Sequence, residues 1–384
     1  MKQKIASIAV LLLLTALTSN ATIRRVGFFA NQIPNQDYFT FLAAYTAATN
    51  NDTILVFPGR SLGSITINKK LIIIGTGNWL DPNTSPKGNA GLQAFASTPG
   101  GGQLMFQSAS AGSVVMGFDF NGSTIFVSAD NITIKRNRDV IVNLAYNTNG
   151  AANAPFPVNN LQLVENYRLT VSDTYTGFSN TNINISNNLM TYLSLSTNSS
   201  FSGNIANNVW AYDGTAGASN GGAGSYSSAT NIALAGGAWL FQNNILASYA
   251  SASAPGNPNY FAFTGETNTV FNYNVALQTN TFASWGTGTG NIITPIANAA
   301  SIFAAFPVIG SASADARYQL AANSPAKVAN RPGSSIDAGI FSGVSPYKLS
   351  TIPSIPTVYL LTSPQGNNPA GNSIQFNVST RGNN

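Results

Sequence analysis

The segment from Asp37 to Gly77 constrains the fold of this chain more than any other stretch. It opens with apolar and small residues spaced three and four positions apart, which places them on one face of a short helix. These residues are Phe39, Leu42, Ala43, Thr46 and Ala47. Asp37 stands where an N-cap is wanted, and the Asn50-Asn51-Asp52 run is expected to stop the helix.

Three short apolar segments follow this helix and predict three strands separated by tight breaks. The segments are Thr53–Phe57, Ser64–Ile67 and Leu71–Gly75, interrupted by Pro58-Gly59 and by Asn68-Lys69-Lys70. Strands this short, with breaks this close, are typical of a chain that coils into a parallel β-solenoid. We expect the helix to cover the open first coil, because that coil otherwise exposes a row of unpaired backbone groups.

A second regular signal is an Asn that follows a short strand and precedes an apolar residue. It occurs as Glu165-Asn166-Tyr167, Asn187-Asn188-Leu189, Asn207-Asn208-Val209, Asn243-Asn244-Ile245 and Tyr273-Asn274-Val275. We interpret these Asn as corner residues, because Asn tolerates the left-handed backbone conformation of a tight corner. Stacked coil on coil, their side chains are predicted to hydrogen-bond along the axis as a ladder. The alternative is that they bind a ligand.

Residues 1–21 have the features of a secretory signal peptide. Two Lys residues precede an apolar run, residues 8–17, and Ser19 and Ala21 place small side chains at the −3 and −1 positions of a cleavage site. The apolar run is too short to span a bilayer comfortably. We therefore expect a secreted or cell-surface protein that is not membrane-spanning once the signal peptide is removed.

The charge balance and the missing residue types exclude several classes of function. The formal charge is +5, and removing Lys2 and Lys4 leaves +3 (5 − 2), which is weak for a nucleic-acid-binding protein. The sequence has no His and no Cys, so a Ser-His-Asp or Cys-His site cannot exist. Since His is also the commonest metal ligand, we expect no metal and no cofactor.

Both ends of the chain resemble a known family. The opening helix and the strands up to Gly75 resemble the start of secreted right-handed parallel β-helix proteins of the pectate-lyase-like superfamily. The runs Asn323–Ala326, Ile336–Phe341 and Pro346–Leu349 resemble the end of that domain in exported proteins of Bacteroidota-type bacteria. The resemblance implies fold and export, while the activity stays open because the fold hosts lyases, hydrolases and adhesins.

One group of charged residues is a candidate catalytic or anion-binding site. The resemblance implies an Arg or Lys base, often beside a carboxylate-bound Ca²⁺, in lyases, and paired Asp residues in hydrolases. Aligning Asn137 with Asn166 puts Arg136 over Glu165 and Asp139 over Arg168, one coil apart. An elimination site and a pair of inter-coil ion pairs both fit this cluster, which comprises Lys135, Arg136, Arg138, Asp139, Glu165 and Arg168.

Aromatic residues near loop edges form a second candidate site. A flat ring can stack on the face of a sugar, and a neighbouring carboxylate can hydrogen-bond its hydroxyls. The alternative is that half of these rings fill the solenoid interior. The carbohydrate-binding candidates are Trp210, Tyr212, Asp213, Trp239 and Trp285.

The sequence as a whole predicts an all-β protein, a right-handed parallel β-helix with an N-terminal capping helix and a short C-terminal β appendage. The expected division is a signal peptide at 1–21, the β-helix at 22–344, and a Pro-rich linker with a two-strand tail at 345–384. The expected role is non-catalytic binding of a polysaccharide or cell-surface glycan, or adhesion. A polysaccharide lyase or glycoside hydrolase and a structural surface protein are the alternatives.

Overall fold

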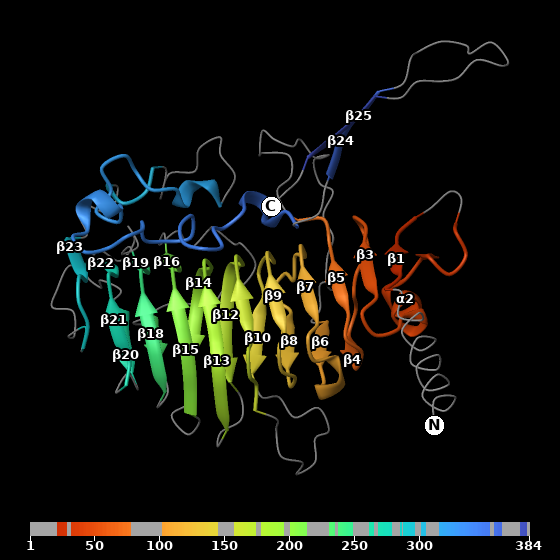
Figure 1. Cartoon of the computed structure of the whole chain (residues 1–384), viewed down its shortest axis with the longest axis horizontal. Helices are drawn as coiled ribbons and strands as arrows, with labels where there is room; N and C mark the ends of the chain where they lie inside the picture. Colours follow the sequence, from red (N-terminus) through yellow and green to blue (C-terminus); the bar gives the residue numbers. More distant parts are fainter. Residues whose placement is uncertain are drawn as a thin grey trace, which may run out of the picture.

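A computed structural model gives the architecture of the chain (Figure 1). It describes residues 21–28, 32–77, 102–144, 157–173, 178–195, 200–212, 230–234, 237–248, 261–264, 268–278, 285, 287–295, 301–304, 315–353, 357–362 and 377–381. Within these residues the chain alternates between two long sheets, and every strand pair in both sheets is parallel. The protein is therefore the predicted right-handed parallel β-helix.

Sheet A has 11 strands whose order follows the chain from coil to coil after the first pair. In spatial order they are β2 (Asp37–Tyr38), β1 (Ile23–Val26), β3 (Thr53–Val56), β5 (Ile72–Ile74), β7 (Val114–Met116), β9 (Thr133–Lys135), β11 (Gln162–Val164), β13 (Ser179–Ser186), β15 (Ser200–Ala206), β18 (Ala238–Gln242) and β21 (Val270–Asn272). The three strands expected between Thr53 and Gly75 are β3 and β5 in this sheet and β4 in the other.

Sheet B has 12 strands and forms the opposite wall of the solenoid. Its main path is β4 (Ile65–Ile67), β6 (Gln103–Phe106), β8 (Thr124–Val127), β10 (Ile141–Leu144), β12 (Tyr167–Asp173), β14 (Leu189–Ser194), β16 (Val209–Tyr212), β19 (Ile245–Ser248), β22 (Val275–Gln278) and β23 (Ile292–Pro295). Two further strands, β17 (Thr230–Ala233) and β20 (Phe261–Thr264), continue from the far half of β14.

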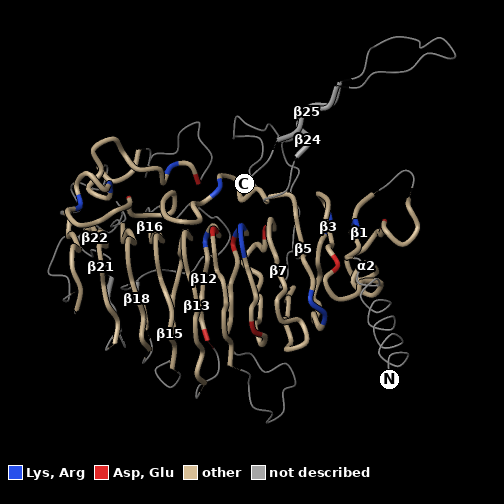
Figure 2. Tube along the Cα trace, in the orientation of Figure 1, with Lys and Arg blue, Asp and Glu red and all other residues tan. Residues whose placement is uncertain are grey.

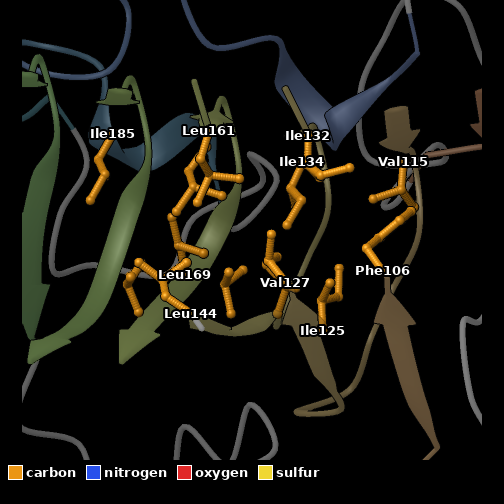
Figure 3. Close-up of a cluster of buried hydrophobic side chains, with 14 of the residues drawn as sticks. Phe106, Val115, Ile125, Val127, Ile132, Ile134, Leu144, Leu161, Leu169 and Ile185 are labelled. Carbon is orange, nitrogen blue, oxygen red and sulfur yellow. The ribbon is translucent and has the colours of Figure 1, made fainter. Parts of the chain in front are cut away.

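The space between the two sheets is a hydrophobic core. Because side chains alternate along a strand, each short strand sends one or two apolar residues inward, as Ile134 does from β9 and Val142 and Leu144 do from β10. Figure 3 shows these side chains stacking coil on coil, from Phe106 and Val115 to Ile185. The stack repeats the inter-strand spacing of about 4.8 Å.

A ladder of Asn side chains runs inside one corner of the solenoid, between sheet A and sheet B, as the sequence predicted. The Oδ1 atom of Asn208 accepts from Asn188 N at 2.9 Å and from Asn188 Nδ2 at 3.1 Å, and the Nδ2 atom of Asn208 donates to Ile185 O at 2.8 Å. The same pattern repeats at every step. The members are Asn137, Asn166, Asn188, Asn208, Asn244, Asn274 and Asn291.

The left-handed corner residue is the one before each ladder Asn, which corrects the sequence-based assignment. Asn187, Asn207 and Asn243 have φ values of 57°, 55° and 54° and point outward, while the Asn that follows each of them points inward. The apolar residue of each triplet, such as Leu189, then lies outside the solenoid in a second hydrophobic cluster. Each triplet thus encodes a corner, a ladder position and an outer contact.

The capping helix exists, but it is shorter than predicted and presents a different face. Helix α2 spans Phe41–Ala47, and its N-cap is Thr40, whose side chain accepts a hydrogen bond from Ala43 N at 3.2 Å. Phe41 and Ala44 are buried against the first coil, whereas Leu42 is 62% exposed. Phe39 is also exposed and precedes the helix. The expected N-cap, Asp37, lies in β2 and pairs with Arg25 instead.

Residues 315–353, here called the C-terminal segment, run back along the outside of the solenoid from its last coils toward its first (Figure 1). Arg331 donates to Tyr273 O at 2.7 Å, Asn187 donates to Ile340 O at 2.9 Å, and Arg136 donates to Ile352 O at 2.9 Å. The segment contains the short 3₁₀ helices η3 (Ala316–Tyr318), η4 (Val328–Asn330) and η5 (Leu349–Thr351), and an earlier one, η1, spans Ser108–Ser110.

A second hydrophobic cluster lies between this segment and the outer corner of the coils. It joins the outward apolar residue of each triplet, such as Val209 and Ile245, to residues of the segment such as Ile340 and Tyr347. The C-terminal β appendage is the antiparallel pair of β24 (Thr357–Thr362) and β25 (Asn377–Arg381). Among the residues that the structure describes, no helix is long and apolar enough to cross a membrane.

Replacing Asn208 by Ala should destabilise the fold strongly. The change removes the acceptor of Asn188 N and Asn188 Nδ2 inside the solenoid, and each buried group left unpaired costs roughly 1–3 kcal/mol. Asn204→Ala, in the same coil but on the outer face, should cost clearly less. Urea unfolding of both variants measures the difference, and equal losses of free energy of unfolding would contradict the ladder's role.

Replacing Phe41 by Ala should cost about 3–5 kcal/mol, because a fully buried ring is lost from the cap of the first coil. Leu42→Ala removes an exposed side chain on the next position and should stay within about 0.5 kcal/mol. Urea midpoints of the two variants test which face of α2 covers the solenoid. A larger loss at Leu42 would show that the helix packs the other way.

Candidate functional site

The charged residues singled out in the sequence come together at one corner, between sheets A and B, near the middle of the solenoid (Figure 2). Glu165 forms two ion pairs with the preceding coil: Lys135 Nζ lies 3.1 Å from Glu165 Oε1, and Arg136 Nε lies 2.6 Å from Glu165 Oε2. The structure therefore places Arg136 beside Glu165 as the alignment of Asn137 with Asn166 predicted. We call these three residues the Glu165 cluster.

The remaining charged candidates form a separate group around Asp139. Arg168 Nη1 lies 2.9 Å from Asp139 Oδ1, and Arg138 Nε lies 3.1 Å from Asp139 Oδ2. Arg138 also reaches Asp119 Oδ2 of the coil before, at 3.0 Å. We call these four residues the Asp139 cluster. Asp119 was missed in the sequence because it is separated from Arg138 by a whole coil and follows no motif.

Four of these residues hold corner positions of the backbone. Arg136, Asp139, Glu165 and Arg168 have φ values of 55°, 51°, 58° and 60°, a conformation that residues other than Gly, Asn and Asp adopt rarely. Arg136 and Glu165 each precede a ladder Asn, so they occupy the place that an Asn occupies in the later coils. The same corner position is therefore charged at Arg136 and Glu165 and neutral in the later coils, at Asn187, Asn207 and Asn243.

The Glu165 cluster faces the C-terminal segment. Ser345 Oγ donates to Glu165 Oε1 at 2.5 Å, and Arg136 Nη1 donates to Ile352 O at 2.9 Å. Arg136 and Glu165 are 2% and 1% exposed. Their charges are therefore used within the chain, as inter-coil ion pairs that also fasten the C-terminal segment, and a polymeric substrate does not reach them in this conformation.

The Asp139 cluster is the more unusual electrostatic site. Burial raises the pKa of Asp139 to about 6, with a smaller contribution from Asp119, although Arg168 and Arg138 oppose the shift. Burial also raises the pKa of Asp119. Asp139, with a pKa of about 6, can therefore exchange a proton near neutral pH, and the Arg138 guanidinium joins it to Asp119. The described residues contain no group of three or more Asp and Glu side chains that could hold a metal ion.

Two of the aromatic candidates lie inside the solenoid, which corrects the expectation that they stack on a sugar. Trp210 and Trp239 are 1% and 2% exposed. Their rings stack on Phe241 and Phe201 at centroid distances of 5.6 and 6.1 Å. They point inward because strand alternation places them on the core face.

Of the other three aromatic-site candidates, only Trp285 has a side chain that the structure describes. Trp285 is half-buried and packs against the core beside Phe271, with 5.9 Å between ring centroids. The backbone of Tyr212 ends β16. Asp213 lies outside the described residues. The three Trp side chains that the structure describes therefore pack on or in the core and do not form an exposed aromatic platform.

A row of amide side chains, which the sequence reasoning did not single out, lines the outer face of sheet A. Asn184 Nδ2 donates to Gln162 Oε1 at 2.8 Å, Asn204 Nδ2 donates to Asn184 Oδ1 at 3.3 Å, and Gln242 Nε2 donates to Asn204 Oδ1 at 3.4 Å. All four side chains are half-buried, at the surface of consecutive coils. We call these residues the strand row.

A second row of exposed amides borders the first, at the corner where the chain enters sheet A. Asn160 Nδ2 donates to Asn131 Oδ1 at 3.0 Å, and Asn182 Nδ2 donates to Asn160 Oδ1. Asn160 and Asn182 stand two positions before Gln162 and Asn184, so the rows run side by side along the solenoid axis. The two rows together form what we call the amide face.

The amide face had a signal in the sequence. Gln162, Asn184 and Asn204 each lie four positions before a ladder Asn, so an amide recurs at a fixed offset from the corner. Side chains alternate between the two faces of a strand, so residues at the same offset from the ladder in successive coils lie in one aligned row. The row could therefore have been predicted from the sequence once the ladder was assigned.

In comparisons with known proteins, no family model, no curated protein and no solved structure matches the chain.

Asp139→Asn should remove a pH dependence of stability between about pH 4 and pH 6. A carboxyl group whose pKa is raised on folding takes up its proton earlier in the folded protein, so it stabilises the fold as the pH falls from about 6 toward 4. The wild-type protein should therefore gain about 2–3 kcal/mol relative to Asp139→Asn across this range. Urea unfolding at pH 4, 5, 6 and 7 measures the gain, and parallel profiles of the two proteins would contradict it.

Proposed function

We propose that this protein is a secreted, non-catalytic β-helix protein that binds a neutral polysaccharide on the amide face. The observation that carries the proposal is the repeat of hydrogen-bonded amides from coil to coil, along the strand row and along the corner row beside it. A polymer lying along the solenoid axis would meet a similar polar group about every 4.8 Å.

The chemistry of the amide face suits hydroxyl groups. A sugar hydroxyl both donates and accepts a hydrogen bond, and a carboxamide offers both functions. In the strand row, Asn204 donates through Nδ2 and accepts through Oδ1 within the row, and each of these atoms has capacity for a further hydrogen bond. The bonds within the row also hold the side chains in place, which lowers the entropy cost of binding.

The charge distribution supports a neutral ligand rather than an acidic one. The strand row and the corner row consist of uncharged amides, while the cations of the neighbouring coils are engaged with Glu165, Asp139 and Asp119. An acidic polysaccharide would need free positive charge beside the chain. A neutral glycan needs many weak polar contacts, which together give useful affinity through repetition.

Export also supports the proposal. The features of a signal peptide at residues 1–21 and the resemblance to secreted pectate-lyase-like proteins of Bacteroidota-type bacteria both favour a protein that acts outside the cell. Glycans of the environment or of a cell surface are the polymers that such a protein meets. The same binding of a glycan would also allow the protein to adhere to a glycan-coated surface.

The test is a glycan array followed by affinity gel electrophoresis on neutral polysaccharides. The Asn184→Ala, Asn204→Ala double variant should bind at least about tenfold more weakly, since each lost polar contact costs about 1 kcal/mol. Gln103→Ala is the matched control, because Gln103 is an exposed amide on β6 of the opposite sheet. It should bind like the wild-type protein.

Three outcomes would overturn the proposal. They are binding that survives the double variant, binding that is lost equally in Gln103→Ala, and binding that requires an acidic polysaccharide and disappears at high salt. Circular dichroism of each variant confirms that the fold is kept. The same samples are assayed for reducing ends and for the ultraviolet absorbance of an unsaturated uronate.

A hydrolytic role is the second candidate, and one observation favours it. Asp119 and Asp139 lie on neighbouring coils, are bridged by Arg138, and both have raised pKa values. Glycoside hydrolysis uses a pair of carboxyl groups, and these two form a pair, although at 4% and 5% exposed they are nearly as buried as Glu165. Release of reducing ends by the wild-type protein that is abolished in Asp139→Asn would favour this candidate over the non-catalytic one.

A further inference from the structure

Asp52 is a fully buried carboxylate that holds the beginning of the first coil. It is 0% exposed, and its Oδ1 atom accepts a hydrogen bond from the backbone nitrogen of Thr22 at 2.7 Å. Its Oδ2 atom accepts from Arg24 Nε and from Thr49 N, both at 2.9 Å. The carbonyl oxygen of Thr22 in turn accepts from Thr53 N at 2.9 Å, so Thr22 is fixed on both sides.

The sequence places a processing site at this same residue. Ser19 and Ala21 supply small side chains at the positions that signal peptidases read, so the expected cleavage is between Ala21 and Thr22. Thr22 would then be the first residue of the mature protein. The nitrogen that becomes the new N-terminus is thus the nitrogen that already touches Asp52.

We infer that cleavage of the Ala21–Thr22 bond creates an α-ammonium group at Thr22 that forms an ion pair with Asp52 and locks the first coil of the mature protein. The reaction is a hydrolysis by an endopeptidase of the signal-peptidase class. Water adds across the bond, Ala21 leaves with a new carboxylate, and the nitrogen of Thr22 becomes a protonated amine. This inference rests on export of the chain and is independent of the proposed glycan binding.

The surroundings of Asp52 fit a charged N-terminus. Burial alone would raise the pKa of Asp52, but the hydrogen bonds from Thr49 and Thr22 and the pairing with Arg24 outweigh it and leave the pKa below its usual value. The carboxylate is therefore ionised at neutral pH. Hydrogen bonds gain strength when the donor also carries a charge, so an ammonium at Thr22 binds this carboxylate more tightly than an amide N–H does.

Three other charged groups near the first coil, Arg24, Arg25 and Lys69, have partners of their own. Arg24 also donates to Tyr38 Oη at 2.9 Å, and Arg25 pairs with Asp37 in β2 at 2.6 Å. From the turn before β5, Lys69 Nζ donates to the carbonyls of Tyr45, Thr46 and Ala48 at the end of α2. Asp52 is thus the carboxylate placed to receive the new charge.

The pH dependence of this pair has a definite sign. A free α-amino group has a pKa of about 7.7–8.0, and pairing with Asp52 raises this pKa in the folded protein. A group whose pKa is raised on folding stabilises the fold fully below its unfolded pKa, and this stabilisation is lost as the pH rises through the folded pKa. The ion pair should therefore act at pH 6–7 and disappear in alkaline solution.

The experiment compares two proteins that both begin at Thr22, one with a free N-terminus and one with an acetylated N-terminus. At pH 6.5 the free form should melt about 2–4 °C higher, and the two melting curves should converge above about pH 10. Asp52→Asn should abolish the difference at all pH values. Asp37→Asn is the matched control, since Asp37 is a buried carboxylate of the same coil without contact to Thr22, and it should preserve the difference.

Direct titration keeps the test decisive if Asp52→Asn fails to fold. The pKa of the α-amino group, followed by nuclear magnetic resonance with ¹⁵N-labelled Thr, should lie above its value in the urea-unfolded chain. N-terminal sequencing of the exported full-length chain should begin at Thr22. An α-amino pKa at or below the unfolded value, equal melting of the free and acetylated forms, or a mature chain that begins elsewhere would each overturn the inference.

Discussion

Every ladder Asn carboxamide from Asn166 to Asn274 bonds several groups at once, and this ties the corner of each coil to the next. Its oxygen satisfies a backbone N–H and a side-chain N–H of the coil before, and its nitrogen binds a backbone carbonyl as well as the next Asn. A corner at which strands end leaves backbone groups that the sheets cannot pair. The ladder pairs them inside the solenoid, where water does not reach, and it thereby fixes the register of all later coils.

The register set by the ladder decides where every other side chain points. Counting from a ladder Asn, the residue before it forms the left-handed corner. From Asn166 to Asn274, the residue after it enters the outer hydrophobic cluster. The residue four positions before it lies on the outer face of sheet A. The charged corner at Arg136 and Glu165, the contacts of Asn187 with the C-terminal segment, and the amide face are therefore three consequences of one repeat.

The parts of this structure that repeat could be predicted from the sequence, and those that depend on single side chains could not. The short strands and the ladder were readable because each coil restates the same pattern. The prediction of which face of α2 is buried was wrong. Phe41 and Ala44 have the same helical spacing as Phe39 and Leu42, so the sequence pattern fits either face and only packing against the first coil distinguishes them. Trp210 and Trp239 were ambiguous for a related reason, since a strand of four or five residues gives too little alternation to separate the core side from the outer side. Asp119 could not be assigned to the charged site from the sequence, because its contact with Arg138 is between coils and no local motif indicates it.

The C-terminal segment changes how the coils depend on one another. In a simple solenoid each repeat interacts with its two neighbours alone, so coils can form or fray one at a time. Here residues 331, 340, 345 and 352 contact residues 273, 187, 165 and 136, so a single stretch of chain touches coils from the last ones to the middle of the array. Nearest-neighbour behaviour therefore gives way to long-range cooperativity. It also follows that a chain that emerges from its N-terminus first cannot complete these contacts until residues 331–352 have emerged, so the solenoid reaches its full stability only when nearly the whole chain is present.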